Sequence, residues 1–321
     1  MKAATYAAGL LGLALLVVLV VHADFAAMLR TLESGGVRLL WLIPYRASFF
    51  GLYALCWLIL LQPYDPGRRA GFGYVFWATT VRDAVDRLLP VASVGGSVVG
   101  VRLLRWRGID AAPAGASVIV EILLTLIVVY LFTALGLLLL SGLDATGQEY
   151  RRVLLAFLLT LPVPLVVVLL LRYGSVFARL ERWVRPLVGA NRLAAEAPLL
   201  DRELRALLGR RRRLLAAGGL QFLALVSGSF EVWFALRLFG QPVDAAEALV
   251  LESMTQAVRH LAFIVPAGLG VQEAGLILFG HAFGVSSELA LAVSMTKRLR
   301  EVLCGLPSLV SWQWCEARRL R

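Results

Sequence analysis

Charged residues are scarce in this sequence, and their scarcity excludes a soluble globular protein. Only 17% of its 321 residues are Asp, Glu, Lys or Arg, whereas 60% are hydrophobic, and the mean hydropathy is +0.79. Soluble domains are about 45–50% apolar, so we expect an integral membrane protein. The net charge of +11 does not indicate a nucleic-acid partner, because the basic residues fall mainly in linkers between apolar runs, where membrane proteins place them.

Cysteine and histidine are also rare, which argues against a metal centre. The three cysteines have no metal-ligand spacing and are interpreted as buried reduced thiols; they are Cys56, Cys304 and Cys315. The three histidines lack the spacing of a metal or acid/base site and are interpreted as structural; they are His22, His260 and His281. No cofactor is expected.

Two catalytic motifs are absent as well. The sequence has no GxxxxGK[ST] phosphate loop, which excludes ATP-driven pumping by the known loop chemistry, and no GxSxG nucleophile elbow. Since no catalytic constellation is found, we expect that the protein is not an enzyme.

Long apolar runs predict six membrane-spanning helices. They cover about residues 3–22, 39–61, 114–140, 152–172, 214–238 and 286–314, each near the roughly 20 residues that a bilayer core requires. The first run is long for a signal peptide and is interpreted as a retained helix. The predicted fold class is an all-α integral membrane protein, a polytopic helical bundle that forms a single transmembrane domain over residues 1–321.

Two further stretches, about 70–107 and 245–284, carry charges and a central Pro/Gly break. Pro90 and Gly108 are 18 residues apart, as are Pro266 and Gly284, and Gln-Pro-x-Asp recurs at 62–65 and 241–244. This pattern predicts an internal duplication, with pseudo-repeats at about 39–140 and 214–314. Non-helical backbone at membrane depth must be buried or line a cavity, and matched broken segments indicate a transported-substrate site.

The arginines predict the orientation of the chain. The stretch 172–213 has 11 Arg against four acidic residues, so the linker at about 173–213 is expected to be cytoplasmic. If both broken segments are re-entrant hairpins without a net crossing, the two termini are cytoplasmic and the repeats are inverted. Alternatively, the linker is a surface helix that binds anionic lipid.

The first broken segment has four charged residues at helical spacing. Arg82 with Asp86, and Asp83 with Arg87, are i,i+4 pairs that cannot face lipid. Either they form a self-neutralised structural network or they contact the substrate.

The Pro/Gly turns indicate an anion site. A short helix that begins after Pro90 or Pro266 directs free N–H groups and the positive end of its dipole at a ligand. Four glycines would allow a ligand or another backbone to come close: Gly95, Gly96, Gly268 and Gly270. The alternative is tight helix packing.

The last apolar span contains Lys297, Arg298, Arg300 and Glu301 near the middle of the bilayer. Lys297 and Glu301 have i,i+4 spacing, and Glu252 or Glu273 are the other available partners. Ionisable groups at this depth need a partner or water. We interpret the cluster as the wall of a water-filled cationic cavity that accepts an anionic group; salt bridges between the repeats are the alternative.

At these residues the chain resembles the flippase-like membrane domain of lysylphosphatidylglycerol synthetases and of stand-alone bacterial and archaeal proteins. The P-x-G-x-G-V-x-E motif of that family is intact as Pro266-Ala267-Gly268-Leu269-Gly270-Val271-Gln272-Glu273, whereas its LP…GGE motif reads Leu89-Pro90 through Gly95-Gly96-Ser97, with Ser97 in place of Glu. The ending Leu306 to Trp314 is similar to the branch associated with hopanoid biosynthesis. The resemblance implies an inner-membrane protein that moves or accommodates a lipid.

Together these patterns predict a lipid translocase whose partner is a membrane lipid with a polar, anionic or aminoacylated headgroup, or a hopanoid. The predicted substrate-binding residues are Arg82, Asp86, Pro90, Gly95, Gly96, Arg259, Pro266, Gly268, Gly270, Gln272, Glu273, Lys297, Arg298, Arg300 and Glu301. We expect a multi-pass protein of the bacterial inner membrane that can form a homo-oligomer. A lipid-modifying integral enzyme and a non-catalytic scaffold for hopanoid enzymes are the alternatives.

Overall fold

The computed structural model describes residues 30, 33–89, 95–142, 148–179, 191–262, 265 and 268–319. Within these ranges it is helical and has no strand. The elements are η1 (Gly36–Trp41), α3 (Leu42–Leu61), α4 (Phe72–Leu88), α5 (Gly95–Trp106), α6 (Ala111–Gly142), α7 (Gln148–Thr160), α8 (Pro162–Tyr173), α10 (Asn191–Leu208), α11 (Arg211–Leu238), α12 (Ala245–Leu261), α13 (Val271–Gly280), η3 (His281–Phe283) and α14 (Ser287–Arg319). The predicted all-α membrane fold is confirmed.

Among the residues that the structure describes, four helical stretches are long and apolar enough to cross a membrane: Glu33–Leu61, Ala111–Ser141, Leu154–Tyr173 and Arg211–Leu238. They correspond to four of the six predicted spans. The predicted span at 3–22 lies outside the described residues. The predicted span at 286–314 forms the helix α14, but the charged residues in its middle make it too polar to count as a candidate membrane span by composition.

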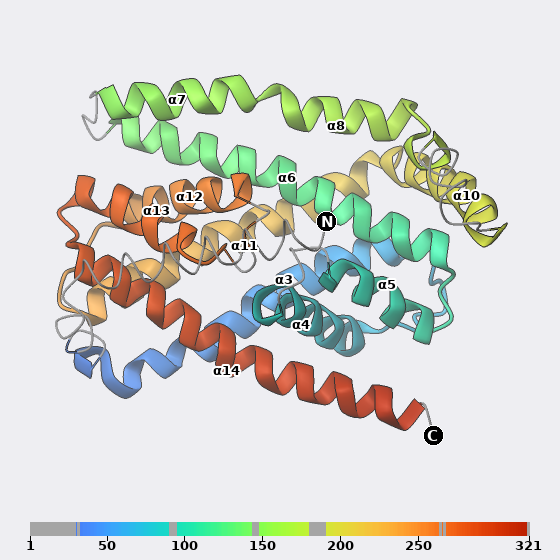
Figure 1. The fold of residues 1–321 in the computed structure, drawn as a ribbon, viewed down its shortest axis with the longest axis horizontal. Coiled ribbons are helices and arrows are strands. Elements are labelled where there is room, and N and C mark those ends of the chain that lie inside the picture. The colour runs from blue at the N-terminus through green and yellow to red at the C-terminus, as the bar shows by residue number, and fades with distance from the viewer. Residues whose placement is uncertain are drawn as a thin grey trace.

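The third candidate span is not a single straight helix. It is divided at Leu161 into α7 and α8, because Pro162 and Pro164 lack the N–H groups that would continue the helical ladder. Only 6% of its most apolar window is buried in the protein. In Figure 1, α7 and α8 lie along one long edge of the molecule, so their apolar side chains are placed to face lipid.

The two broken segments have the same order of elements. In each, a helix of 17 residues, α4 or α12, is followed by a break and a shorter helix, α5 or α13. Gly108 and Gly284, which lie 176 residues apart, both have positive φ, 74° and 70°. The next N–H in each copy reaches back five residues, from Ile109 to Leu104 (3.3 Å) and from Val285 to Gly280 (3.0 Å), which is the helix-ending pattern that favours glycine.

Each half has its own apolar core, one built from α3 to α6 and one from α11 to α14. The halves meet in a reciprocal way: α3 packs along α11, α4 packs against α14, and α12 packs against α6. In Figure 1, α3 and α14 run from left to right, whereas α11 and α6 run from right to left. In this view α3 and α11, which hold the same place in the two halves, have opposite directions, and so do α6 and α14.

The Arg-rich linker contains the amphipathic helix α10. Its Leu204 and Leu207 are completely buried against α6 and α8, while Arg202 and Arg205 are exposed. Asp201 on the same helix accepts N–H groups from Phe177 (3.2 Å) and Ala178 (2.8 Å). Helix α10 of the linker is thus a packed part of the fold, with Arg202 and Arg205 on its exposed face.

Candidate functional site

A cavity of about 580 Å³ lies between the two halves. Its volume falls within the roughly 300–1,000 Å³ of small-ligand sites. Residues from α3, α4, α5, α6, α11, α12 and α14 line it, together with Val265 and Gly268 of the second break. The broken segments thus both contribute to one cavity.

Charged side chains form most of the polar wall of this cavity. Six are basic, Arg46, Arg82, Arg87, Arg259, Lys297 and Arg300, and six are acidic, Asp83, Asp86, Glu121, Glu231, Glu252 and Glu301. The prediction of a cationic cavity is therefore wrong for the described lining, which is charged but balanced. The cations of α14 were visible as one run in the sequence, whereas three of their acidic partners, Glu231, Glu252 and Glu273, come from other helices.

In the first half, Arg82 is held by α6 and not by its own helix. Its Nη1 donates to Glu121 (2.6 Å), its guanidinium lies 4.2 Å from the centre of the Trp57 ring, and a Cβ at Gly100 would collide with it. The predicted pair with Asp86 is not formed. Asp86 instead accepts the N–H of Gly96 (2.8 Å) at the start of α5, so it links the two helices on either side of the break.

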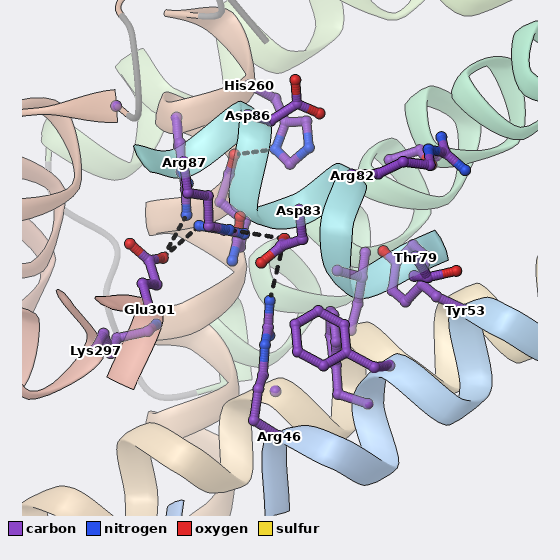
Figure 2. A pocket seen from close by; sticks show the side chains of 18 of the residues that line it. Arg46, Tyr53, Thr79, Arg82, Asp83, Asp86, Arg87, His260, Lys297 and Glu301 are labelled. Carbon is purple, nitrogen blue, oxygen red and sulfur yellow. Dashed lines mark hydrogen bonds and ion pairs between the residues drawn. The ribbon is translucent and has the colours of Figure 1, made fainter. Parts of the chain in front are cut away.

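A chain of ion pairs crosses the cavity (Figure 2). Arg46 of α3 lies 3.6 Å from Asp83, and Arg87 donates to Asp83 over 2.8 Å. The predicted i,i+4 pair of Asp83 and Arg87 is thus present. Arg87 also donates to Glu301 of α14, which joins the first half to the second.

The basic residues of α14 are paired with acids from distant segments. Lys297 donates to Glu252 of α12 (2.6 Å), and Arg300 donates to Glu231 of α11. The i,i+4 pair of Lys297 with Glu301 is not formed, because Glu252 faces the ammonium across the helix interface. Both pairs lie within the second repeat, whereas the pair of Arg87 and Glu301 is a salt bridge between the repeats, which was the alternative interpretation of the cluster. Lys297, Arg300 and Glu301 also line the cavity.

Gln272 and Glu273 of the P-x-G-x-G-V-x-E motif belong to a hydrogen-bonded network beside the cavity. Gly268 and Gly270 have positive φ, 60° and 74°, and the Arg259 side chain lies where a Cβ on Gly268 would point. Arg259 donates to Gln272 (3.1 Å), Gln272 donates to Ser294 (2.9 Å), and Ser294 donates to Glu273 (2.9 Å). The motif therefore positions Arg259.

Glu273, which has no exposed surface, also fixes Arg298. The Arg298 Nε lies 3.2 Å from Glu273, and its Nη2 donates to the carbonyl oxygen of Gly268 (3.1 Å). Arg298 thus ties the second break to α14 from outside the cavity lining.

The predicted residues consequently divide into three groups. Seven line the cavity: Arg82, Asp86, Arg259, Gly268, Lys297, Arg300 and Glu301. Six lie in the breaks or in their supporting network and not in the lining: Gly95, Gly96, Gly270, Gln272, Glu273 and Arg298. Pro90 and Pro266 lie outside the described residues.

Sequence reasoning missed several lining residues: Arg46, Glu121, Glu231, His260, and the aromatic side chains Phe49, Phe50 and Tyr53. Glu121 and Glu231 stand alone in long apolar runs, and an isolated ionisable residue in a membrane span is a functional-site signal in its own right. The aromatic residues have no such signal, because they are ordinary in an apolar helix.

The 176-residue spacing of the two helix-ending glycines also relates two oppositely charged lining residues, Glu121 of α6 and Lys297 of α14. Glu121 accepts from a base of the short helix α4, whereas Lys297 donates to an acid of the short helix α12. Their partners do not correspond at this spacing, because Arg82 aligns with Val258 and Glu252 aligns with Phe76.

No group of three or more His, Cys, Asp or Glu side chains within the described ranges is arranged to hold a metal ion. The family model described as "Lysylphosphatidylglycerol synthase TM region" matches residues 6–307, which confirms the family predicted from the motifs. Neither the curated proteins nor the solved structures contain a match to this chain.

Proposed function

The chain belongs to the family of lysylphosphatidylglycerol synthase transmembrane regions, and we propose that it is a lipid translocase. A polar headgroup would enter the cavity between the halves while the apolar body of the lipid stays in the bilayer. The observation that carries the proposal is the cavity itself: about 580 Å³, lined by both broken segments and by twelve charged side chains. A membrane protein that only needs stability has little use for so many buried charges.

The composition of the wall supports a lipid ligand. Phe49, Phe50 and Tyr53 of α3 line the same cavity as the ion pairs, together with Ile122 and Leu126 of α6. A headgroup has polar atoms next to the start of apolar chains, so a wall that is part ionic and part apolar matches that junction.

The arrangement of helices supports alternating access. Corresponding helices of the two halves run in opposite directions (Figure 1), which is the arrangement expected of inverted repeats that expose one site to each side in turn. With the Arg-rich linker on the cytoplasmic side, we place the protein in the bacterial inner membrane with cytoplasmic termini. The link to hopanoids stays a prediction from the ending of the sequence.

Reconstitution in liposomes tests the proposal. Purified protein should accelerate the exchange of a labelled phospholipid between leaflets, and Arg82→Gln or Lys297→Gln should reduce that rate at least tenfold, because each leaves a buried carboxylate unpaired. Arg212→Gln, the same change at an exposed position, should leave the rate unchanged. The test covers anionic, aminoacylated, zwitterionic and hopanoid lipids. The proposal is overturned if the protein exchanges none of them faster than empty liposomes do.

A further inference from the structure

Glu301 is surrounded by guanidinium groups to an unusual degree. Arg87 donates to it, an Arg298 nitrogen lies 3.3 Å from it, and the nitrogens of Arg300 and Arg259 lie at 3.9 and 4.0 Å. Its side chain is only 4% exposed. Four arginines around one small anion form the kind of site that proteins use to bind phosphate.

We propose that these four arginines form a phosphodiester-binding site and that Glu301 occupies it when no substrate is bound. The inference rests on the proposed function, since it identifies the part of a lipid headgroup that the cavity recognises. During transport the phosphodiester would displace the Glu301 carboxylate and take over its contacts with Arg87, Arg259, Arg298 and Arg300.

The arginines are held in place independently of Glu301. Arg87 has a second carboxylate partner in Asp83, Arg298 in Glu273, and Arg300 in Glu231. Arg259 is fixed by Gln272 and packs over Gly268. If Glu301 moved away, the four guanidinium groups would therefore keep their places, as a binding site requires.

Arg259 gives the clearest indication that Glu301 occupies the place of a bound anion. Glu301, at 4.0 Å, is its single ion-pair partner among the described residues, and Arg259 lines the cavity. That distance is too long for a hydrogen bond. The carboxylate thus fills the position without satisfying Arg259, which leaves it available to a larger anion with more oxygen atoms.

Charge balance favours a diester over a monoester. A phosphodiester and a carboxylate each have one negative charge, so a diester in the place of Glu301 leaves the charge between the four arginines unchanged, and the displaced carboxylate would turn into the cavity that it lines. A phosphate monoester has about −1.5 to −2 charges at neutral pH and would bring an uncompensated charge into a buried site, which is unfavourable. The phosphodiester of a glycerophospholipid fits the site better than inorganic phosphate.

Anion affinity of the purified full chain tests this inference without measuring transport. Isothermal titration with glycerophosphoglycerol should give a dissociation constant at least tenfold lower for Glu301→Gln than for the wild type, because the competing carboxylate is gone. The affinity for inorganic phosphate should increase by a smaller factor. Glu301→Asp, which keeps the charge but retracts it, should give an intermediate gain and serves where Glu301→Gln does not fold.

Two matched variants separate a specific site from a general change in charge. Glu121→Gln removes a buried carboxylate from the same cavity, but from Arg82, and should give no gain in affinity. Adding Arg259→Gln to Glu301→Gln should abolish the gain. In nanodiscs, native mass spectrometry should show more phosphatidylglycerol retained by Glu301→Gln than by the wild type, with diacylglycerol unchanged.

The inference is overturned if neither Glu301 variant binds the diester more tightly, if Glu121→Gln gains as much, or if inorganic phosphate gains more than the diester. The outcome for the proposed function is separate. A wild-type protein that exchanges lipids, with no gain in the Glu301 variants, rejects the inference alone. A gain in affinity, without exchange of any lipid in liposomes, rejects translocation and leaves an anion-binding membrane protein.

Discussion

At the scale of single residues, glycines determine where the charged side chains lie. Gly96 and Gly100 of α5 leave the space that Asp86 and Arg82 of α4 occupy, and Gly268 does the same for Arg259. The sequence indicated that something approaches Gly96 and Gly268 closely. It did not indicate that the approaching groups are side chains of the preceding helix.

Gly96 provides the sharpest test of this role. A Cβ at Gly96 would collide with the carbonyl oxygen of Arg82 and with the Asp86 carboxylate, so α4 and α5 would have to separate. We expect Gly96→Ala to destabilise the protein by about 1–3 kcal/mol, the usual range for overpacking, and to slow lipid exchange. Thermal unfolding in detergent and the liposome assay measure the two effects.

Gly219→Ala is the matched control, because nothing lies within 4 Å of its Cβ position in the middle of α11. Alanine favours a helix over glycine by roughly 1 kcal/mol, so this variant should be at least as stable as the wild type. Equal stability of the two alanine variants would contradict the role given to Gly96.

At the scale of helices, local sequence patterns predicted the elements but not their partners. Apolar runs and Pro/Gly breaks gave the helices of both halves, and the i,i+4 rule correctly paired Asp83 with Arg87. The same rule predicted that Arg82 pairs with Asp86 and Lys297 with Glu301. The observed partner of Arg82 is instead Glu121, 39 residues away. That of Lys297 is Glu252, 45 residues away. Tertiary packing chose them, because only a group on a neighbouring helix faces the buried charge directly.

The pair of Lys297 and Glu252 joins α14 to α12, and removing it in two steps should separate stability from function. Each single variant, Lys297→Met or Glu252→Leu, leaves one buried charge alone and should cost about 3–5 kcal/mol. The double variant should recover most of that stability, since two well-packed apolar side chains often replace a buried pair without loss. Lipid exchange should stay low in all three.

Thermal unfolding of the four proteins gives the coupling energy of the pair, and the liposome assay gives the exchange rates. A double variant that exchanges lipid at the wild-type rate would show that the pair is structural. A double variant no more stable than either single variant would show that the two groups are not coupled.

At the scale of the whole molecule, the two halves share their order of helices and contribute equally to the charge of the cavity wall. Among the described lining residues, each half supplies three bases and three acids: Arg46, Arg82, Arg87, Asp83, Asp86 and Glu121 in the first, and Arg259, Lys297, Arg300, Glu231, Glu252 and Glu301 in the second. This balance was not predictable from the run of cations in the last helix, because all the acids but Glu301 lie on other helices, α4, α6, α11 and α12.

The opposite directions of corresponding helices predict that the loops before the two broken segments lie on opposite sides of the membrane. Two prolines are exposed in these loops: Pro66, which follows the first Gln-Pro-x-Asp motif, and Pro242, which belongs to the second. In a chain with Cys56, Cys304 and Cys315 replaced by Ala, a membrane-impermeant maleimide applied to spheroplasts should label Pro242→Cys and leave Pro66→Cys unlabelled. Permeabilised membranes should label both. Labelling of both cysteines in intact spheroplasts would place the two loops on the same side of the membrane. The halves would then not be inverted, and alternating access by inverted repeats would be contradicted.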